Sequence, residues 1–401
     1  MASITDPQRT PTPVPADTPA ARTPATAPES GTLPPIDAVL SAARVVAIPT
    51  RTRFRGIEVR EAVVFDAPRG PSEFSPFPEY DDAEAASWLA AALDFGWGEA
   101  PPPLRDTIAV NATVPAVAAE EVAGILARFP GCTTAKVKVA ERGQSLADDI
   151  ARVRAVREAM GEDALIRIDA NGGWTVDEAA HALRTLSEFD LDYAEQPCVT
   201  VPELVELRHR LTTGRRADDG QAEGRRAEGE RAEEPGFLAD AAFPASAGRS
   251  PLVRIAADES VRKAEDPLAV ARAGAADLLV VKAQPLGGVG RALRIVEEAG
   301  LPVVVSSALD TSAGISMGLR LAAALPEHLL AGACGLGTVA LLQGDVAADP
   351  LVPVDGRLRV RRPALDPELL DRYAASPERE AWWRERIARC RAVLDSRGSR
   401  L

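Results

Sequence analysis

The chain has 401 residues, of which 46% are hydrophobic and 26% are charged, and its formal net charge is −13 at pH 7. This length can bury one large core or two modest ones, while the acidic balance argues against a nucleic-acid binder, which normally carries a basic patch. The four cysteines are widely spaced, no run reaches 18 consecutive apolar residues, and the N terminus lacks a secretory signal, so we expect a cytoplasmic protein with reduced thiols and no membrane span.

The first part of the chain predicts a tail followed by a small domain. Residues 1–34 are rich in Pro, Thr and Ala, a composition typical of disorder. Residues 35–107 then contain two strand-like runs, a loop and a helix-like run. We expect them to form an α+β capping domain, to which the C-terminal segment, residues 346–401, contributes by packing on the cap or the barrel.

The middle of the chain predicts a TIM-like (β/α) barrel over residues 108–345. Short apolar runs alternate with amphipathic helical runs at a spacing of about 25 residues, which indicates a parallel sheet of seven to eight units. No GxGxxG motif follows the first strand, which disfavours a dinucleotide-binding fold. Residues 213–250 interrupt the rhythm with a charged, Gly- and Ala-rich segment that we expect to be a disordered insertion.

The lysines are scarce and their positions are unusual. Only four of the 46 basic residues are lysines: Lys136, Lys138, Lys263 and Lys282. Lysine can release its proton when its pKa is perturbed, whereas arginine cannot near neutral pH, so the lysines kept in such a chain are candidates for chemistry. Lys136 and Lys138 lie on one face of the strand-like run "TAKVKV", where burial is costly without partners.

Three carboxylates end consecutive predicted strands: Asp169 in "RIDANGGW", Glu195 in "YAEQP" and Asp258 in "AADES". Lys282 ends the next strand. Because strand ends converge at the mouth of a barrel, these acids are expected to bind Mg²⁺ or Mn²⁺ and to pair with the lysines. Such a cluster, together with the cation, would lower the lysine pKa values toward those of a usable base. Each acid could instead cap a following helix.

These motifs resemble those of a known family. The chain contains "GPSEF", "NATVPA", "KVKV", "RIDANGGW", "YAEQPC", "ADES", "VVKAQPLGGVG", "SSALDTSAGI" and "GLGT". The set resembles the lysine-based, muconate-lactonizing-like subgroup of the enolase superfamily and, within it, the o-succinylbenzoate synthases of actinobacterial type. The resemblance implies an enolase-type barrel with a capping domain.

The resemblance also implies an activity. Members of this family are carbon–oxygen lyases that act on a small-molecule carboxylate, with Mg²⁺ as cofactor and no nucleic-acid or membrane partner. The reaction is a syn elimination of water through an enediolate. It converts 2-succinyl-6-hydroxy-2,4-cyclohexadiene-1-carboxylate to 2-succinylbenzoate in menaquinone biosynthesis.

Roles for individual residues follow from the same resemblance. Lys138 would remove the α-proton, Lys282 would steady the enediolate from the other side, and Lys136 would tune Lys138. The metal ligands would be Asp169, Glu195 and Asp258. The candidates for substrate contact are Asn171, Ser306, Ser307 and Arg55, together with the loops 53–57 and 72–80 of the capping domain.

Two alternatives stay open at this stage. An N-acylamino acid racemase, a dipeptide epimerase or a muconate-type cycloisomerase of the same superfamily would need the same two lysines, Lys138 and Lys282. A protein of another class, a non-catalytic interaction protein on a decayed barrel, would not need the full set of acids and lysines, which is intact here.

Overall fold

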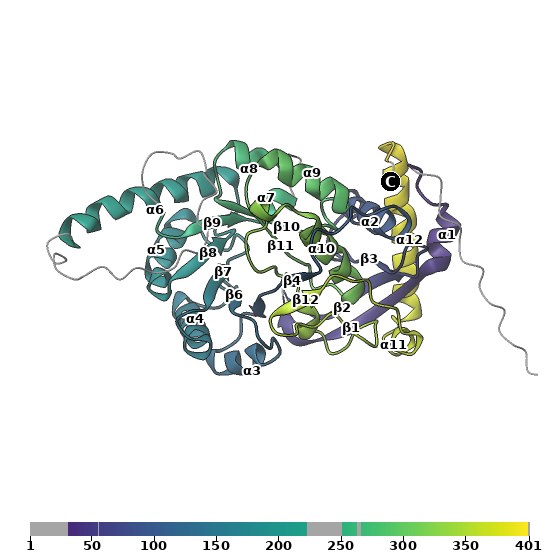
Figure 1. Ribbon diagram of the computed structural model, residues 1–401, viewed down its shortest axis with the longest axis horizontal. Coiled ribbons are helices and arrows are strands. Elements are labelled where there is room, and N and C mark those ends of the chain that lie inside the picture. The colour runs from purple at the N-terminus through teal and green to yellow at the C-terminus, as the bar shows by residue number, and fades with distance from the viewer. Residues whose placement is uncertain (1–30, 55, 223–250, 263–265, 400–401) are drawn as a thin grey trace, which may run out of the picture.

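The computed structural model describes residues 31–54, 56–222, 251–262 and 266–399. The N-terminal tail up to residue 30, the segment 223–250 and Arg55 lie outside the described residues, so the predictions made for them stay predictions. Two groups of elements are visible in Figure 1, one built on a small sheet and one on a parallel sheet ringed by helices.

The small sheet has three antiparallel strands in the order β1–β2–β3. Its elements are α1 (Ile36–Ala42), β1 (Ala43–Phe54), β2 (Ile57–Phe65), β3 (Ser72–Phe74) and α2 (Asp82–Trp97), joined by α12 (Pro377–Ser396) from the far end of the chain. Phe74, Trp88 and Trp383 share one apolar core there. Trp383 and Arg379 both donate hydrogen bonds to Glu61 on β2, at 2.9 and 2.6 Å, so the C-terminal helix is tied to the first strands, beside which it lies in Figure 1.

The large sheet is a barrel of parallel strands. Seven strands follow the order β11–β10–β9–β8–β7–β6–β5. They are β5 (Ala112–Val114), β6 (Thr134–Lys138), β7 (Leu165–Asp169), β8 (Leu191–Glu195), β9 (Arg254–Ala257), β10 (Leu278–Val281) and β11 (Val303–Val305). The segment 331–335 closes the ring, because Cys334 bonds to Ala109 and Gly335 bonds to Val305 through their backbones, both at 2.8 Å. The predicted TIM-like barrel is confirmed.

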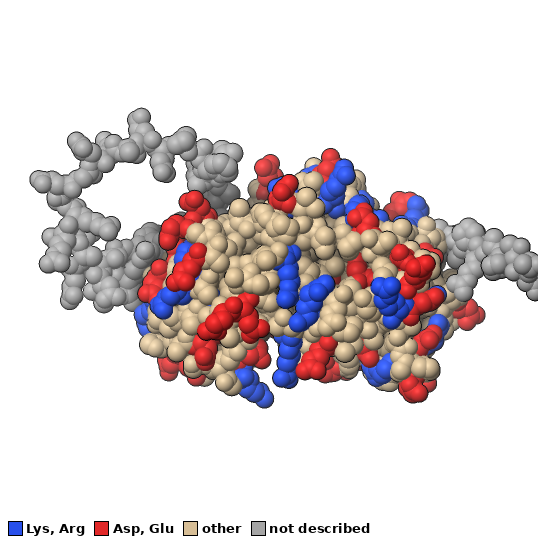
Figure 2. All heavy atoms as spheres, turned by 90° about the horizontal axis from the view of Figure 1, so that it is seen from below, with Lys and Arg blue, Asp and Glu red and all other residues tan. Residues whose placement is uncertain are grey.

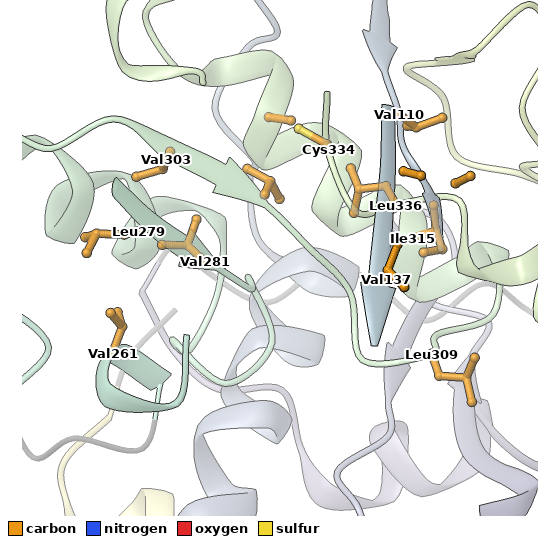
Figure 3. Packing of buried hydrophobic residues seen from close by; sticks show 14 of the residues in the cluster. Val110, Val137, Val261, Leu279, Val281, Val303, Leu309, Ile315, Cys334 and Leu336 are labelled. Atoms are coloured by element: carbon orange, nitrogen blue, oxygen red, sulfur yellow. The ribbon is translucent and has the colours of Figure 1, made fainter. Parts of the chain in front are cut away.

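Side chains alternate between the two faces of the barrel wall, as the two-residue period of a strand requires. Leu279 and Val281 belong to the large core between strands and helices, part of which Figure 3 shows. Leu278 and Val280 belong to a separate cluster inside the barrel. The same period turns Lys282 inward.

Helices cover the outside of the barrel. They are α3 (Val122–Leu126), α4 (Leu146–Met160), α5 (Val176–Leu186), α6 (Val201–Ala222), α7 (Glu259–Arg262), α8 (Ala269–Arg272), α9 (Val289–Ala299) and α10 (Ser312–Ala324). Outside this set lie a short antiparallel pair of strands, β4 (Thr107–Ala109) and β12 (Arg357–Arg359), and helix α11 (Pro367–Arg372). Helix α6 extends to Ala222, so its last residues overlap the start of the segment 213–250. The expectation of a disordered insertion there stays a prediction.

Two surface properties bear on possible partners. None of the helices in the described part of the chain combines the length and the apolar character needed to cross a membrane. On the face shown in Figure 2, acidic and basic side chains are interspersed.

The N terminus of α10 joins the small sheet to the barrel. Glu73 on β3 is fully buried and accepts hydrogen bonds from the backbone of Thr311 and Gly314, at 3.1 and 3.0 Å, and from the side chains of Ser75 and Thr311. Asp345 accepts from the backbone of Ser312 at 2.9 Å. The free N–H groups that begin a helix are thus satisfied by carboxylates from two distant segments.

This junction predicts a large effect of one substitution. Glu73→Ala removes the acceptor of the backbone N–H groups of Thr311 and Gly314 and leaves these buried donors unpaired, so we expect it to destabilise the fold by at least about 2 kcal/mol. The matched control is Glu99→Ala, whose side chain is 83% exposed and pairs with Arg69; it should cost less than about 1 kcal/mol. Thermal unfolding followed by circular dichroism measures both, and equal midpoints would contradict the role given to Glu73.

Candidate active site

The predicted site residues lie at one end of the barrel. Lys138, Asp169 and Glu195 are the last residues of β6, β7 and β8. Asp258 and Lys282 directly follow β9 and β10. Because all these strands are parallel, their carboxyl ends meet at the same mouth, and the strand pairing places Lys138 beside Asp169 and Asp169 beside Glu195.

Each of the three lysines there is paired with an acid. The Nζ of Lys136 lies 2.9 and 3.1 Å from the two carboxylate oxygens of Glu195 and 3.3 Å from Oδ2 of Asp169. The Nζ of Lys138 lies 2.5 Å from Oδ2 of Asp169. The buried lysines of the "TAKVKV" strand are therefore tolerated because carboxylates from neighbouring strands compensate their charge.

A matching pair lies across the mouth. The Nζ of Lys282 is 2.5 Å from Oδ2 of Asp258, and both side chains are buried. In the closed ring, β6 and β10 are separated by three strands on one side and by β11, the closing segment and β5 on the other. Lys138 and Lys282 therefore end on opposite walls.

The charges shift one another's pKa values. Burial opposes the charge on Lys136, but Glu195 and Asp169 outweigh it and raise its pKa. Burial and repulsion from Asp169 raise the pKa of Glu195 to about 8, whereas Lys138 and Lys136 overcome the burial of Asp169 and lower its pKa. The protein groups alone therefore place the pKa of Lys136 above that of a free lysine, because its acidic partners outweigh burial. The expectation of lowered lysine pKa values concerns the site with its cation and stays a prediction.

A small pocket lies between these groups. Its wall includes Lys136, Lys138, Asp169, Asp258 and Lys282. Cations and anions from different strands thus line one cavity at the mouth of the barrel.

The acids are not helix caps. Ser145, Thr175 and Thr200 begin the helices after β6, β7 and β8, and each side chain bonds to an acid three residues later. This leaves Asp169 and Glu195 to face the lysines, so the capping explanation fails for these two residues.

The donor set suits a hard divalent cation. Among the described residues, no three acidic, histidine or cysteine side chains are already arranged as a metal cage, since each acid at the mouth faces an ammonium group. The Lys136 ammonium nevertheless contacts Asp169 and Glu195 together, so one cation can reach both. Oxygen-only ligands are those that Mg²⁺ prefers, and the assignment of Asp169, Glu195 and Asp258 as its ligands stays a prediction.

Three of the four residues predicted to touch the substrate line the pocket. Asn171 lines the pocket, its Oδ1 lies 2.6 Å from Nζ of Lys138, and its Nδ2 bonds to Glu259. Ser306 and Ser307 also line the pocket, but the Ser307 hydroxyl already donates to the backbone of Gly335 at 2.8 Å. Arg55 lies outside the described residues.

Some site residues escaped the sequence reasoning. Thr113 and Thr338 line the same pocket. They stand in "NATVPA" and "GLGT", stretches that carried the family resemblance, so the signal was present. Phe54 also lines it, with its ring 5.6 Å from Nζ of Lys138, and it belongs to the 53–57 loop that the sequence had marked as a candidate. Gln196 was missed too: its Oε1 accepts from the backbone of Asp258 at 3.0 Å and so fixes the end of β9.

Comparison with solved structures identifies the same architecture. The muconate lactonizing enzyme of Pseudomonas fluorescens, solved with muconolactone, superposes with a TM-score of 0.62 at 19% identity and covers 83% of this chain and 98% of its own. A dipeptide epimerase of Enterococcus faecalis, solved with Mg and the dipeptide L-Leu-L-Tyr, gives 0.59 at 19% identity and covers 80% and 96%. At these identities the likeness shows the fold alone.

Sequence comparison identifies the family. The model described as Enolase N-terminal domain-like matches residues 45–96, and that described as Enolase C-terminal domain-like matches residues 117–219 and 231–364. The o-succinylbenzoate synthase of Mycolicibacterium smegmatis is 49% identical over 90% of this chain and 99% of its own length, and that of Thermobifida fusca is 50% identical over 88% and 96%. The chain therefore belongs to the enolase superfamily and, within it, to the family of o-succinylbenzoate synthases.

Proposed function

We propose that this chain is a Mg²⁺-dependent o-succinylbenzoate synthase. It removes water from 2-succinyl-6-hydroxy-2,4-cyclohexadiene-1-carboxylate and releases 2-succinylbenzoate, a step of menaquinone biosynthesis. The identity of about half of all residues to o-succinylbenzoate synthases over nearly the full chain supports the reaction. One structural observation carries the roles of the residues: Lys138 and Lys282 end on opposite walls of one pocket that also contains carboxylates.

The substrate carboxylate belongs at the acidic side of this pocket. A bound Mg²⁺, held by Asp169, Glu195 and Asp258, would neutralise the negative charge that builds on this carboxylate when the neighbouring carbon loses its proton. The Lys136 ammonium lies against Asp169 and Glu195 and holds these two side chains in place.

Lys138 acts as the base and then as the acid. Its Nζ takes the proton from the ring carbon that bears the carboxylate, and the electron pair of that C–H bond passes into the carboxylate. The same Nζ then returns this proton to the ring hydroxyl, which leaves as water while the ring becomes aromatic. Asn171 and Asp169 orient the amine through contacts of 2.6 and 2.5 Å.

Lys282 keeps its proton throughout the reaction. From the wall opposite Lys138, its ammonium stabilises the negative charge of the enediolate, and Asp258 holds it in position at 2.5 Å. The two lysines thus have different tasks: one must lose a proton and the other must stay positively charged.

We extend the proposal to the location of the protein, which we place in the cytoplasm on the state of its cysteines. All four cysteines are free thiols, as a reducing compartment requires, and three of them are buried.

The proposed reaction can be tested directly. Incubation of the protein with the cyclohexadiene substrate and Mg²⁺ should change the ultraviolet spectrum to that of the aromatic product. Treatment with EDTA should abolish the change, and added Mg²⁺ or Mn²⁺ should restore it. N-succinylamino acids, followed by polarimetry, serve as the comparison substrate. Faster racemisation of these than dehydration would contradict the proposal.

The different tasks of the two lysines predict different responses to the same substitution. Lys138→Arg removes a base, because guanidinium keeps its proton, and should reduce kcat by more than about 10³-fold. Lys282→Arg retains a positive charge and should reduce kcat by only about 10- to 100-fold. Steady-state kinetics measures both. A larger loss for Lys282→Arg than for Lys138→Arg would reverse the assignment.

A further inference from the structure

The Lys282–Asp258 pair poses a problem for metal binding. The Lys282 ammonium lies 2.5 Å from Oδ2 of Asp258, so it occupies the carboxylate that a divalent cation needs. When a cation binds Asp258, two positive charges compete for one acid. The ammonium then loses most of its stabilisation unless another anion is within reach, because an unpaired buried charge is strongly unfavourable.

A second acid lies behind Lys282. A very small pocket is lined by Lys282, Gln284, Ser306, Asp310 and Gly314, among others, and it shares Lys282 and Ser306 with the wall of the active-site pocket. Asp310 is 5% exposed, and within the described residues its Oδ1 accepts no hydrogen bond. The carboxylate thus has an oxygen available to a donor that enters this pocket.

The other charged groups around Asp310 do not use this oxygen fully. Arg60 approaches Oδ1 only to 3.9 Å and donates its hydrogen bonds to the backbone of Leu309 and Ser75 instead. Glu73, the other acid of this junction, is already held by its own donors on α10. Burial raises the pKa of Asp310, whereas Arg60 and Lys282 act to lower it, so the approach of an ammonium group would stabilise its ionised form.

We propose that Asp310 is a positioning residue that receives the Lys282 ammonium when a divalent cation binds Asp258. Lys282 then moves from one carboxylate to the other within the barrel mouth and stays charged and buried, ready to face the enediolate. Gln284 lies two residues after Lys282 on the chain and lines the same small pocket as Asp310, so the loop that carries Lys282 already adjoins its second partner. The inference rests on the proposed metal site.

The test measures cation binding without turnover. Mg²⁺ affinity is determined by isothermal titration calorimetry, with no substrate present. Asp310→Asn should weaken Mg²⁺ binding about tenfold, because Lys282 would then compete more strongly for Asp258. In a Lys282→Gln background, which lacks the competing ammonium, Asp310→Asn should have no effect on the affinity.

The control is Asp345→Asn, which removes another buried acid from the same helix terminus but not from the small pocket. It should leave Mg²⁺ affinity unchanged. Equal losses for Asp345→Asn and Asp310→Asn, or a loss for Asp310→Asn that persists in the Lys282→Gln background, would overturn the inference and indicate a purely structural role.

A second measurement needs no variant at Asp310. Because the chain has only four lysines, ¹⁵N-lysine labelling gives few ammonium signals, and Lys282→Gln identifies the one from Lys282. That signal should shift when Mg²⁺ is added and remain protected from exchange with water. Its loss through rapid exchange would overturn the inference, whereas a wild-type protein that binds no Mg²⁺ at all would overturn the proposed metal site instead.

Discussion

The pairing of buried ammonium and carboxylate groups at the mouth of the barrel is the constraint on which the site depends. Lys136, Lys138 and Lys282 face Asp169, Glu195 and Asp258, so the amino groups of three lysines meet the carboxyl groups of three acids in a region largely screened from water. Loss of any one partner leaves a buried charge without compensation. Because the partners come from five different strands, the balance exists only once the barrel has closed.

The small sheet contributes to the same site through the start of α10. Glu73 and Asp345 hold the first turn of this helix, and the loop between β11 and α10 carries Ser306, Ser307 and Asp310. The position of that loop therefore depends on a carboxylate from the small sheet. This gives a physical reason why a barrel with a complete set of strands still needs the rest of the chain to build its mouth.

The sequence predicted those parts of the site that follow from local periodicity. Asp169, Glu195, Asp258 and Lys282 each end a strand, and the two-residue period determines which way they point. The contacts of Glu73, the open oxygen of Asp310 and the place of Phe54 depend on how distant segments meet, which periodicity does not encode. The effect of the protein groups on the pKa of Lys136 has the same origin: its direction depends on how close Glu195 lies, and only the folded structure gives that distance.

The charge balance also explains why a cation and the substrate belong together in this pocket. When all three acids are ionised and all three lysines are protonated, the six paired side chains are neutral as a group, so a divalent cation alone would leave an excess of positive charge at a buried place. The substrate of the proposed reaction carries two carboxylates, and it restores neutrality when it enters with the cation. An arginine at position 138 would keep this balance but could not exchange a proton with the substrate, which is a physical reason for lysine at this position in a chain that otherwise uses arginine.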